Sequence, residues 1–383
     1  MTVDRWGMDI GGSAESIAAW NEAWDRFLSF TGDPLELLAH ANEHDDEFVM
    51  GSVMQGVYAL TSGSPLDAPA VRTAVERATV RDGGPHAEAL VSMAAGDFTA
   101  AGDAFAALGA EGDFAAYRFA HDIFLHVADA ERRLAWSDRS IAHGFADGQN
   151  FIDGMHSFTL NEVGRHDEAV EFGERALAVE PRDLWARHAL AHVYEDRDDR
   201  EASFPLLEAT SDDWREQDAL ALHVWWHLAL RYLAVGRYDD ALTLYDARVD
   251  DATTPFRLCD LTSLLWRLEL RGQAVGDRWD VLADRWAQVG ERHTCGFLDL
   301  HATFVFVRRP DHPGAAVWFG GLAARPDGDA EIDDIFEQVA KPLVAAIRNE
   351  DAAALDNLAP TLHRIGGSNA QRSVVSLTAG AWR

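Results

Sequence analysis

The sequence predicts an all-α protein in which helical hairpins stack as a solenoid of tetratricopeptide-like repeats. Apolar residues recur at helical spacing through nearly the whole chain, and strand signals are almost absent. Gly-Asp and Gly-Arg turns separate the apolar stretches. A unit of 34 residues recurs, which is the length of a tetratricopeptide repeat. We expect the array to curve, and closure on itself around a central pocket is one form it could take.

The clearest repeat unit spans residues 150–181. Gly164 lies at its predicted turn, followed by Ala169, Ala176 and Pro181 at intervals of five, seven and five residues. Glycine permits a tight turn between two helices, and proline ends the second helix. The small alanine side chains let the two helices pack closely. This spacing is typical of a tetratricopeptide repeat.

Stepping by this period divides the chain into three parts. We expect repeats over 82–249, with N-terminal helices over 1–81 that pack on the solenoid and divergent C-terminal hairpins over 250–383. The repeat units are predicted to begin near residues 82, 116, 150, 184 and 222. No long linker interrupts the pattern, so we expect one continuous structural unit.

Composition and charge exclude several classes of partner. The chain has 383 residues and a net charge of −31, whereas nucleic acids and anionic membranes bind basic surfaces. The two cysteines, Cys259 and Cys295, are too few for a disulfide framework. The N-terminal sequence lacks the pattern of a signal peptide, and the most apolar stretch is too short and polar for a membrane span. These features predict a cytoplasmic protein, and they leave the oligomeric state open.

Two consecutive predicted helices each carry a His-x-x-x-His pair. "HALAHVYE" contains His188, His192 and Glu195, and "HVWWHLAL" contains His223 and His227. Counted in the repeat frame, these five side chains point into the concave groove from adjacent helices. Residues four apart share one face of a helix, and packed helices lie about 8–10 Å apart. We therefore expect the four imidazoles to converge.

Several chemistries fit this constellation. The five side chains are our candidates for general acid–base catalysis, because local environment can bring His and Glu pKa values near neutrality. The four histidines are also candidate ligands for a divalent metal ion. The alternatives are a peptide clamp and hydrogen-bonded core histidines. The frame also places Phe158 in the groove. We expect the following histidines to be surface or packing residues: His40, His44, His86, His166, His312 and His363.

Several segments resemble the tetratricopeptide-repeat protein 38 family over nearly the full length. They include "RFAHD" (118–122), "HALAHVYE" (188–195) and "GGSNAQR" (366–372). The resemblance implies a divergent tetratricopeptide solenoid and says little about activity. It adds candidate substrate-binding residues, which are His121, Asp122, Trp226, Asp260, Asp299, His301, Asn369 and Arg372.

The "GGSNAQR" segment permits two interpretations. Its glycines can end one helix while Ser368 or Asn369 caps the next. If the solenoid curls into a ring, the segment would instead cover the groove and place Arg372 against an anionic ligand.

The predicted function is binding of a small anionic molecule, with acid–base chemistry that a metal could assist. Lyase, isomerase and hydrolase-like reactions all fit. Serine-hydrolase, nucleotide-hydrolase and dinucleotide motifs are absent from the sequence. The alternative is a non-catalytic tetratricopeptide scaffold that binds a peptide or a protein in the groove.

Overall fold

The structure is a computed structural model. It describes residues 3–62, 64, 66–80, 84–145, 148–210, 214, 218–252, 254–289, 293, 295–325 and 330–383. Asp82, the start of the first predicted repeat, and most of the loop 211–217 lie outside these residues. The described residues form helices and connecting turns, apart from one isolated β-bridge between Val3 and Asp9. Among the helices described, none has the length and apolar character needed to cross a membrane.

The chain divides into two compact units. Unit 1 comprises Met1–Val193 and Asp212–Leu220, and unit 2 comprises Tyr194–Ser211 and Ala221–Arg383. The boundaries predicted after residues 81 and 249 stay predictions.

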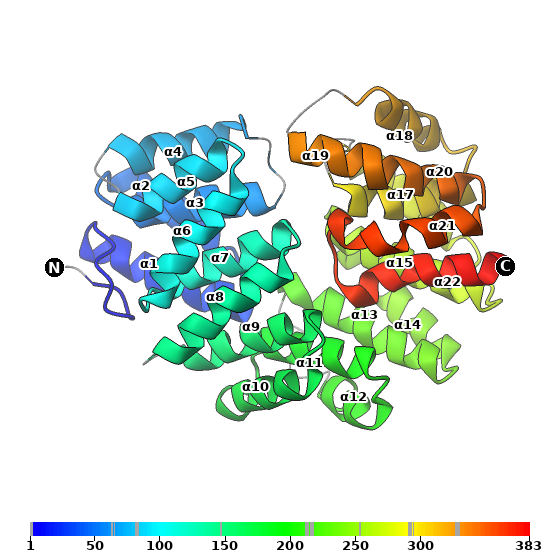
Figure 1. Ribbon diagram of the computed structural model, residues 1–383, viewed down its shortest axis with the longest axis horizontal. Helices are drawn as coiled ribbons and strands as arrows, with labels where there is room; N and C mark the ends of the chain where they lie inside the picture. The colour runs from blue at the N-terminus through cyan, green and yellow to red at the C-terminus, as the bar shows by residue number, and fades with distance from the viewer. Residues whose placement is uncertain are drawn as a thin grey trace. The chain divides into compact units, whose positions relative to one another are not determined.

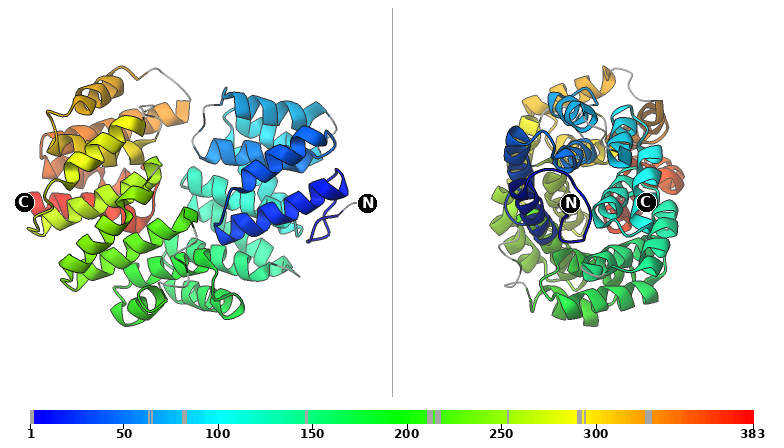
Figure 2. Two further views of the ribbon diagram at one scale, coloured as in Figure 1. Left: turned by 180° about the vertical axis from the view of Figure 1, so that it is seen from behind. Right: turned by 90° about the vertical axis from the view of Figure 1, so that its left-hand side faces the viewer.

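Unit 1 consists of helices that pack in neighbouring pairs, as the sequence predicts (Figure 1, Figure 2). Its helices are α1 (Ala14–Ser29), α2 (Pro34–His44), α3 (Val49–Thr61), α4 (Pro69–Val80), α5 (Gly84–Ala94), α6 (Phe98–Ala110), α7 (Phe114–His126), α8 (Ala130–His143), α9 (Gln149–Glu162), α10 (His166–Val179) and most of α11 (Leu184–Asp196).

The predicted unit at 150–181 forms the hairpin of α9 and α10. Gly164 lies between the two helices with a φ of +81°, a region that glycine adopts without strain. Ala169 and Ala176 are fully buried where α10 packs on its neighbours. Small side chains at these two places allow the close approach that the spacing predicts.

The N-terminal segment before α1 packs against the first helices of unit 1. Asp4 accepts a hydrogen bond from the indole Nε1 of Trp20 at 3.2 Å. Trp6 stacks on Phe114 with ring centroids 4.2 Å apart and an interplanar angle of 11°. The edge of Trp6 also meets Trp24, with centroids 5.5 Å apart. Asp4 and Trp6 therefore join the segment before α1 to aromatic side chains of α1 and α7.

Unit 2 continues with helical hairpins and ends at the C-terminal helix. Two helices are divided between the units: unit 2 contains the end of α11 and the part of α13 (Asp218–Ala234) that begins at Ala221. The other elements of unit 2 are α12 (Arg200–Leu207), α14 (Tyr238–Arg248), η1 (Val249–Asp251), α15 (Pro255–Leu270), α16 (Arg278–Val289), α17 (Gly296–Arg308), α18 (Pro313–Ala323), α19 (Ala330–Ile335), the π-helical turn η2 (Phe336–Ala340), α20 (Lys341–Arg348), α21 (Ala352–Leu358), η3 (Ala359–Ile365) and α22 (Asn369–Trp382).

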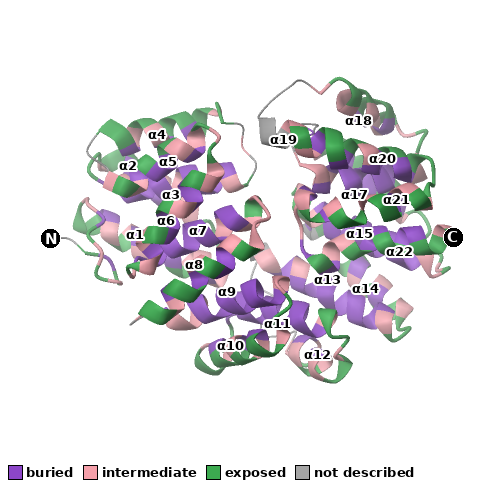
Figure 3. Cartoon of the chain, viewed as in Figure 1, coloured by how far each residue is buried: buried purple, intermediate pink, exposed green. Residues whose placement is uncertain are grey.

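Helix α15 is the buried centre of unit 2 and packs against α16, α17 and α22 (Figure 3). Trp266 on α15 stacks on Phe304 of α17 with centroids 4.3 Å apart. Its Nε1 donates a hydrogen bond to Thr378 Oγ1 of α22 at 2.8 Å. This packing holds the polar face of α15 against the first turns of α22.

The start of α22 confirms the capping interpretation of "GGSNAQR". Gly366 and Gly367 adopt φ values of +85° and +74° after η3. Ser368 caps α22 by accepting a hydrogen bond from the Gln371 N–H, and Gln371 Oε1 accepts one from the Ser368 N–H. This reciprocal pair is a capping box.

Candidate functional site

The candidate site in unit 2 begins with a histidine–aspartate pair. His223 on α13 lies with its Nδ1 2.9 Å from Asp260 Oδ2 of α15. Gln371 of α22 donates to the other oxygen of Asp260 at 3.3 Å. Because a carboxylate accepts, Nδ1 of His223 carries the proton and Nε2 carries the lone pair. His223 is thereby oriented as a base or as a metal ligand.

Trp226 connects this pair to a neighbouring arginine. Its ring stacks on His223 with centroids 5.3 Å apart and an interplanar angle of 14°. The guanidinium carbon of Arg267 on α15 lies 5.9 Å from the centroid of the Trp226 ring. The aromatic face therefore has an imidazole and a cation close to it within unit 2.

Arg267 is one of three arginines that line a pocket of about 390 Å³ in unit 2. We call this cavity the arginine pocket. Its walls come from α13, α15 and α22 together with one side chain at the end of α11. The lining residues are Glu195, Leu230, Arg231, Leu233, Ala234, Arg267, Arg271, Ser373, Ser376 and Leu377.

The formal charge of this lining is +2, because three arginines oppose one glutamate. Glu195 forms an ion pair with Arg231, which neutralises one of the cations. Burial raises the pKa of Glu195, whereas Arg231 lowers it. Arg267 and Arg271 therefore supply the excess positive charge.

Arg267 is held in place by neutral hydrogen-bond acceptors. Its guanidinium donates to Ser263 Oγ at 3.2 Å, to the Ala370 carbonyl at 2.8 Å and to Ser373 Oγ at 3.2 Å. In the part of the chain that the structure describes, no carboxylate forms an ion pair with it. Burial lowers the pKa of Arg267 to about 10, which leaves the group charged at neutral pH.

Unit 1 contains the first histidine pair. His188 and His192 on α11 have their Nε2 atoms 2.8 Å apart, so one ring donates and the other accepts. Phe158 of α9 stacks on His188 with centroids 5.4 Å apart and meets His192 edge-on at 5.1 Å. Trp185 lies edge-on to His188 at 5.2 Å. The pair thus lies in an aromatic environment to which Phe158 contributes.

His121 lies in the same aromatic cluster of unit 1. Its Nδ1 lies 3.2 Å from Asp122 Oδ1, and Asp122 also accepts hydrogen bonds from Arg118 and Tyr58. Burial lowers the pKa of His121 to about 4. His121 is consequently a neutral imidazole at physiological pH, and Asp122 is the carboxylate of a structural network.

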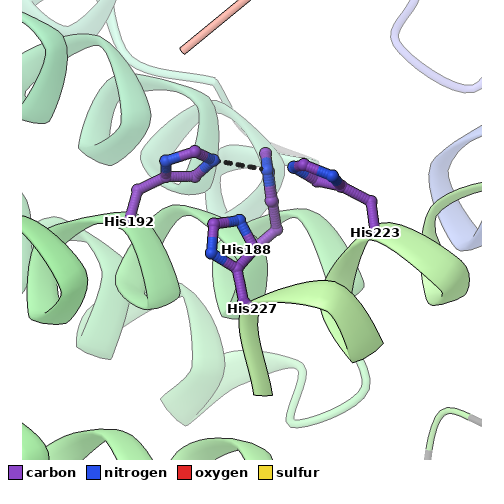
Figure 4. A group of neighbouring side chains, drawn as sticks. All are labelled: His188, His192, His223 and His227. Carbon is purple, nitrogen blue, oxygen red and sulfur yellow. Dashed lines mark hydrogen bonds between the residues drawn. The ribbon is translucent and has the colours of Figure 1, made fainter. Parts of the chain in front are cut away.

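The two predicted histidine pairs lie in different units, with His188 and His192 in unit 1 and His223 and His227 in unit 2. Within each pair the two rings lie side by side, with centroids 4.5 Å apart in the first pair and 4.8 Å apart in the second. Figure 4 draws the four side chains. We call these residues the four-histidine group. Imidazole nitrogens are common zinc ligands, and a tetrahedral ion takes four.

Other predicted binding residues have structural partners. His301 is fully buried, and its Nδ1 donates to the Phe297 carbonyl one turn earlier at 2.8 Å. Burial lowers the pKa of His301 to about 4, so it is a neutral core histidine. Asp299 lies 2.6 Å from Nδ1 of the buried His293, a partner that the sequence reading missed.

Arg372 and Asn369 bond to each other at the start of α22. Arg372 donates to the carbonyls of Gly366 and Gly367 and to Asn369 Oδ1 at 2.7 Å. These contacts bind the guanidinium to its own loop, and neither residue is among those that line the arginine pocket. The predicted contact of Arg372 with an anionic ligand stays a prediction.

Arg267 is the basic residue that the sequence reading missed. A signal for it exists, because Asp260, Ser263 and Arg267 follow the helical spacing of one face. That spacing would have placed Arg267 beside the predicted Asp260. Its partners on α22 lie more than one hundred residues away and carry no such local signal.

No family model matches the chain, and no solved structure matches it significantly. The resemblance to the tetratricopeptide-repeat protein 38 family therefore stays a prediction that rests on its motifs.

Proposed function

We propose that unit 2 binds a small organic anion in the arginine pocket and transfers a proton to or from it through His223. The supporting observation is the charge of the pocket. A chain with a net charge of −31 surrounds this cavity with three arginines and a single glutamate. Burying an excess of positive charge is unfavourable unless an anion offsets it. A carboxylate-bearing ligand would supply that charge.

Arg267 is the central binding residue in this proposal. A guanidinium presents several N–H groups in a planar fork that matches the two oxygens of a carboxylate. Leu230, Leu233 and Leu377 supply apolar walls for the remainder of the ligand. A volume of about 390 Å³ is at the lower end of the range for small-molecule sites. This size favours a small molecule over an extended peptide.

His223 supplies the acid–base group. Asp260 holds its Nδ1 proton and would stabilise the imidazolium that forms when Nε2 accepts a proton. Trp226 contacts both groups, because its ring stacks on His223 and its centroid lies 5.9 Å from the guanidinium carbon of Arg267. His223 is not itself among the residues that line the arginine pocket, so the proposed proton transfer takes place at the side of the pocket nearest Trp226. The reaction class that fits is a lyase or isomerase step in which a proton is removed near the bound carboxylate.

We further infer that the repeats are of the tetratricopeptide type. The conformation of Gly164 and the burial of Ala169 and Ala176 support this inference, because they reproduce the turn and the close helix approach of such a repeat.

Binding can be tested by calorimetric titration and thermal shift with a panel of mono- and dicarboxylates and phosphate. We expect a carboxylate to raise the melting temperature of the wild type and Arg267→Gln to weaken its binding at least tenfold. Arg285→Gln is a matched control, because Arg285 forms its ion pair with the exposed Asp250. Circular dichroism would confirm that each variant is folded. Failure of every panel anion to bind the wild type would contradict the proposal.

The acid–base step needs a separate variant. His223→Gln keeps a polar side chain but removes the titrating nitrogen. We expect it to bind the carboxylate with little change in affinity and to lose turnover by a factor of about 10² or more. Unchanged turnover would show that His223 is not the base.

A divalent metal ion at the four-histidine group is a second candidate function. The adjacency of the two rings within each His-x-x-x-His pair supports it, with centroids 4.5 Å apart for His188 and His192 and 4.8 Å apart for His223 and His227. The His223–Asp260 contact also fits, because a metal-binding histidine usually donates its other N–H to a carboxylate or carbonyl. Elemental analysis of untagged protein tests this candidate. We expect about one equivalent of metal, and a content far below one equivalent argues against it.

A further inference from the structure

A second group of metal-binding side chains lies on α2, away from the residues discussed so far. His40, Glu43 and His44 each offer one ligand atom, and the three atoms lie within 4.8 Å of one another. All three residues are exposed. The sequence alone suggested that the two histidines are ordinary surface residues. Because Glu43 lies beside them, the two histidines can act together with it as ligands of one metal ion.

Helical spacing brings these three side chains to one face. His40 and His44 are four residues apart and have ring centroids 4.6 Å apart. Glu43 is three residues after His40 and therefore lies on the same side of α2. The order His-x-x-Glu-His is also found in a class of zinc peptidases, where both histidines bind the metal. Here the three ligand atoms lie on the exposed surface of α2, and metal binding is the property that this geometry supports.

The hydrogen bonding of His44 fixes which nitrogen can bind a metal. Its Nδ1 lies 2.9 Å from the carbonyl oxygen of His40. A carbonyl only accepts, so Nδ1 carries the proton and Nε2 carries the lone pair. This is the arrangement of metal-binding histidines, in which the second ring nitrogen donates to a carbonyl or carboxylate.

The local charge favours a cation. Glu36 precedes His40 by one helical turn, and Asp46 and Glu47 follow the end of α2 within three residues of His44. The whole chain carries a net charge of −31. Clustered carboxylates of one sign raise the local concentration of cations.

We propose that His40, Glu43 and His44 form a surface binding site for a divalent cation of the zinc class. Two imidazoles and one carboxylate are suitable ligands for zinc, copper(II) and nickel(II), whereas magnesium and calcium prefer oxygen alone. Ligand atoms around a tetrahedral zinc ion lie about 3.3 Å apart. The exposed side chains reach this spacing by small rotations. Three protein ligands leave one position for water or for a donor from another molecule.

The proposal can be tested by titrating zinc into full-length, untagged protein by calorimetry and by equilibrium dialysis. The double variant His40→Ala/His44→Ala removes both imidazoles. We expect the wild type to bind one more equivalent of zinc than this variant. Glu43→Gln should lower the affinity for that additional zinc ion several-fold, and His40→Ala should lower it about tenfold or more.

Two controls separate this site from the rest of the molecule. His363→Ala removes another exposed histidine and should leave the zinc stoichiometry unchanged. The melting temperature of each variant without metal should equal that of the wild type, because surface substitutions change stability little. Equal zinc stoichiometry and affinity in the wild type and the double variant would overturn the proposal. A metal bound by the four-histidine group would contribute equally to both proteins.

Discussion

The buried carboxylate of Asp183 gives a sharp prediction about stability. Asp183 precedes α11, and its Oδ1 accepts a hydrogen bond from the Ala186 N–H at 3.0 Å. The residue is 2% exposed, and its Oδ2 lacks a hydrogen-bond partner among the described residues. Burial raises the pKa of Asp183 from 3.8 to about 7, although the backbone N–H groups oppose this. Ionising Asp183 is therefore more costly in the folded protein than in the unfolded chain.

The sign of the pH dependence follows from this difference. Between pH 3.8 and 7 the folded state binds more protons at Asp183 than the unfolded state does, so stability falls as the pH rises. The stabilisation from this residue is complete below pH 3.8 and is lost above pH 7. One pH unit corresponds to about 1.4 kcal/mol, so the total loss is about 4 kcal/mol.

Asp183→Asn removes the charge and keeps the acceptor that caps α11. The new amide N–H₂ replaces the unbonded Oδ2, which costs about 1–2 kcal/mol of desolvation. At pH 8 we therefore expect a net stabilisation of about 2–3 kcal/mol. At pH 4 the same exchange should give no stabilisation, because Asp183 is then protonated in the folded protein.

Thermal and urea unfolding at pH 4, 6 and 8, followed by circular dichroism, would measure this effect. A gain of about 2–3 kcal/mol corresponds to about 4–12 °C for a unit of this size. Asp351→Asn is the matched control, because Asp351 caps α21 with its carboxylate exposed to water. A variant that is equally destabilised at all three pH values would refute the reasoning, since it would show that the ionised carboxylate of Asp183 stabilises the fold.

Three other predictions concern packing, capping and metal removal. A Cβ at Gly173 would lie 2.6 Å from Leu190 Cγ, so Gly173→Ala should lower the free energy of unfolding in urea by about 1–3 kcal/mol. A Cβ at Gly320 would meet open space, so the control Gly320→Ala should raise the free energy of unfolding by about 0.5–1 kcal/mol. Ser368→Ala breaks the capping box of α22 and should cost about 1 kcal/mol, measured in the same way. If the four-histidine group holds a metal, chelation should lower the melting temperature of the wild type and leave a His188→Ala/His227→Ala variant unchanged. An equal response of both proteins to the chelator would contradict this assignment.

Local patterns predict the helices well because their determinants are close in sequence. Gly164 turns the chain where the spacing indicates, and Ala169 and Ala176 are buried as small residues between helices should be. The same helical spacing puts the two histidines of each pair on one face of their helix, where their rings adjoin. Periodicity and turn chemistry are sufficient for these features.

The polar partners of the site depend on contacts that local patterns do not encode. Arg267 bonds to α22 across more than one hundred residues, so its role follows from packing alone. Arg372 looks available in the sequence but binds the carbonyls of its own loop. His301 is a candidate binding residue from the family resemblance, and its Nδ1 is bonded to the Phe297 carbonyl within the core. A polar residue on a helix can therefore be located from the sequence before its partner is known.

The segment that precedes α1 has a consequence for handling this protein. Helical hairpins leave apolar side chains exposed wherever no neighbouring element covers them. Trp6 and Asp4 provide such a cover over Phe114, Trp24 and Trp20. A shortened protein that begins at α1 would lose the stacking partner of Phe114 and the hydrogen-bond acceptor of the Trp20 indole, and apolar surface exposed in this way favours self-association.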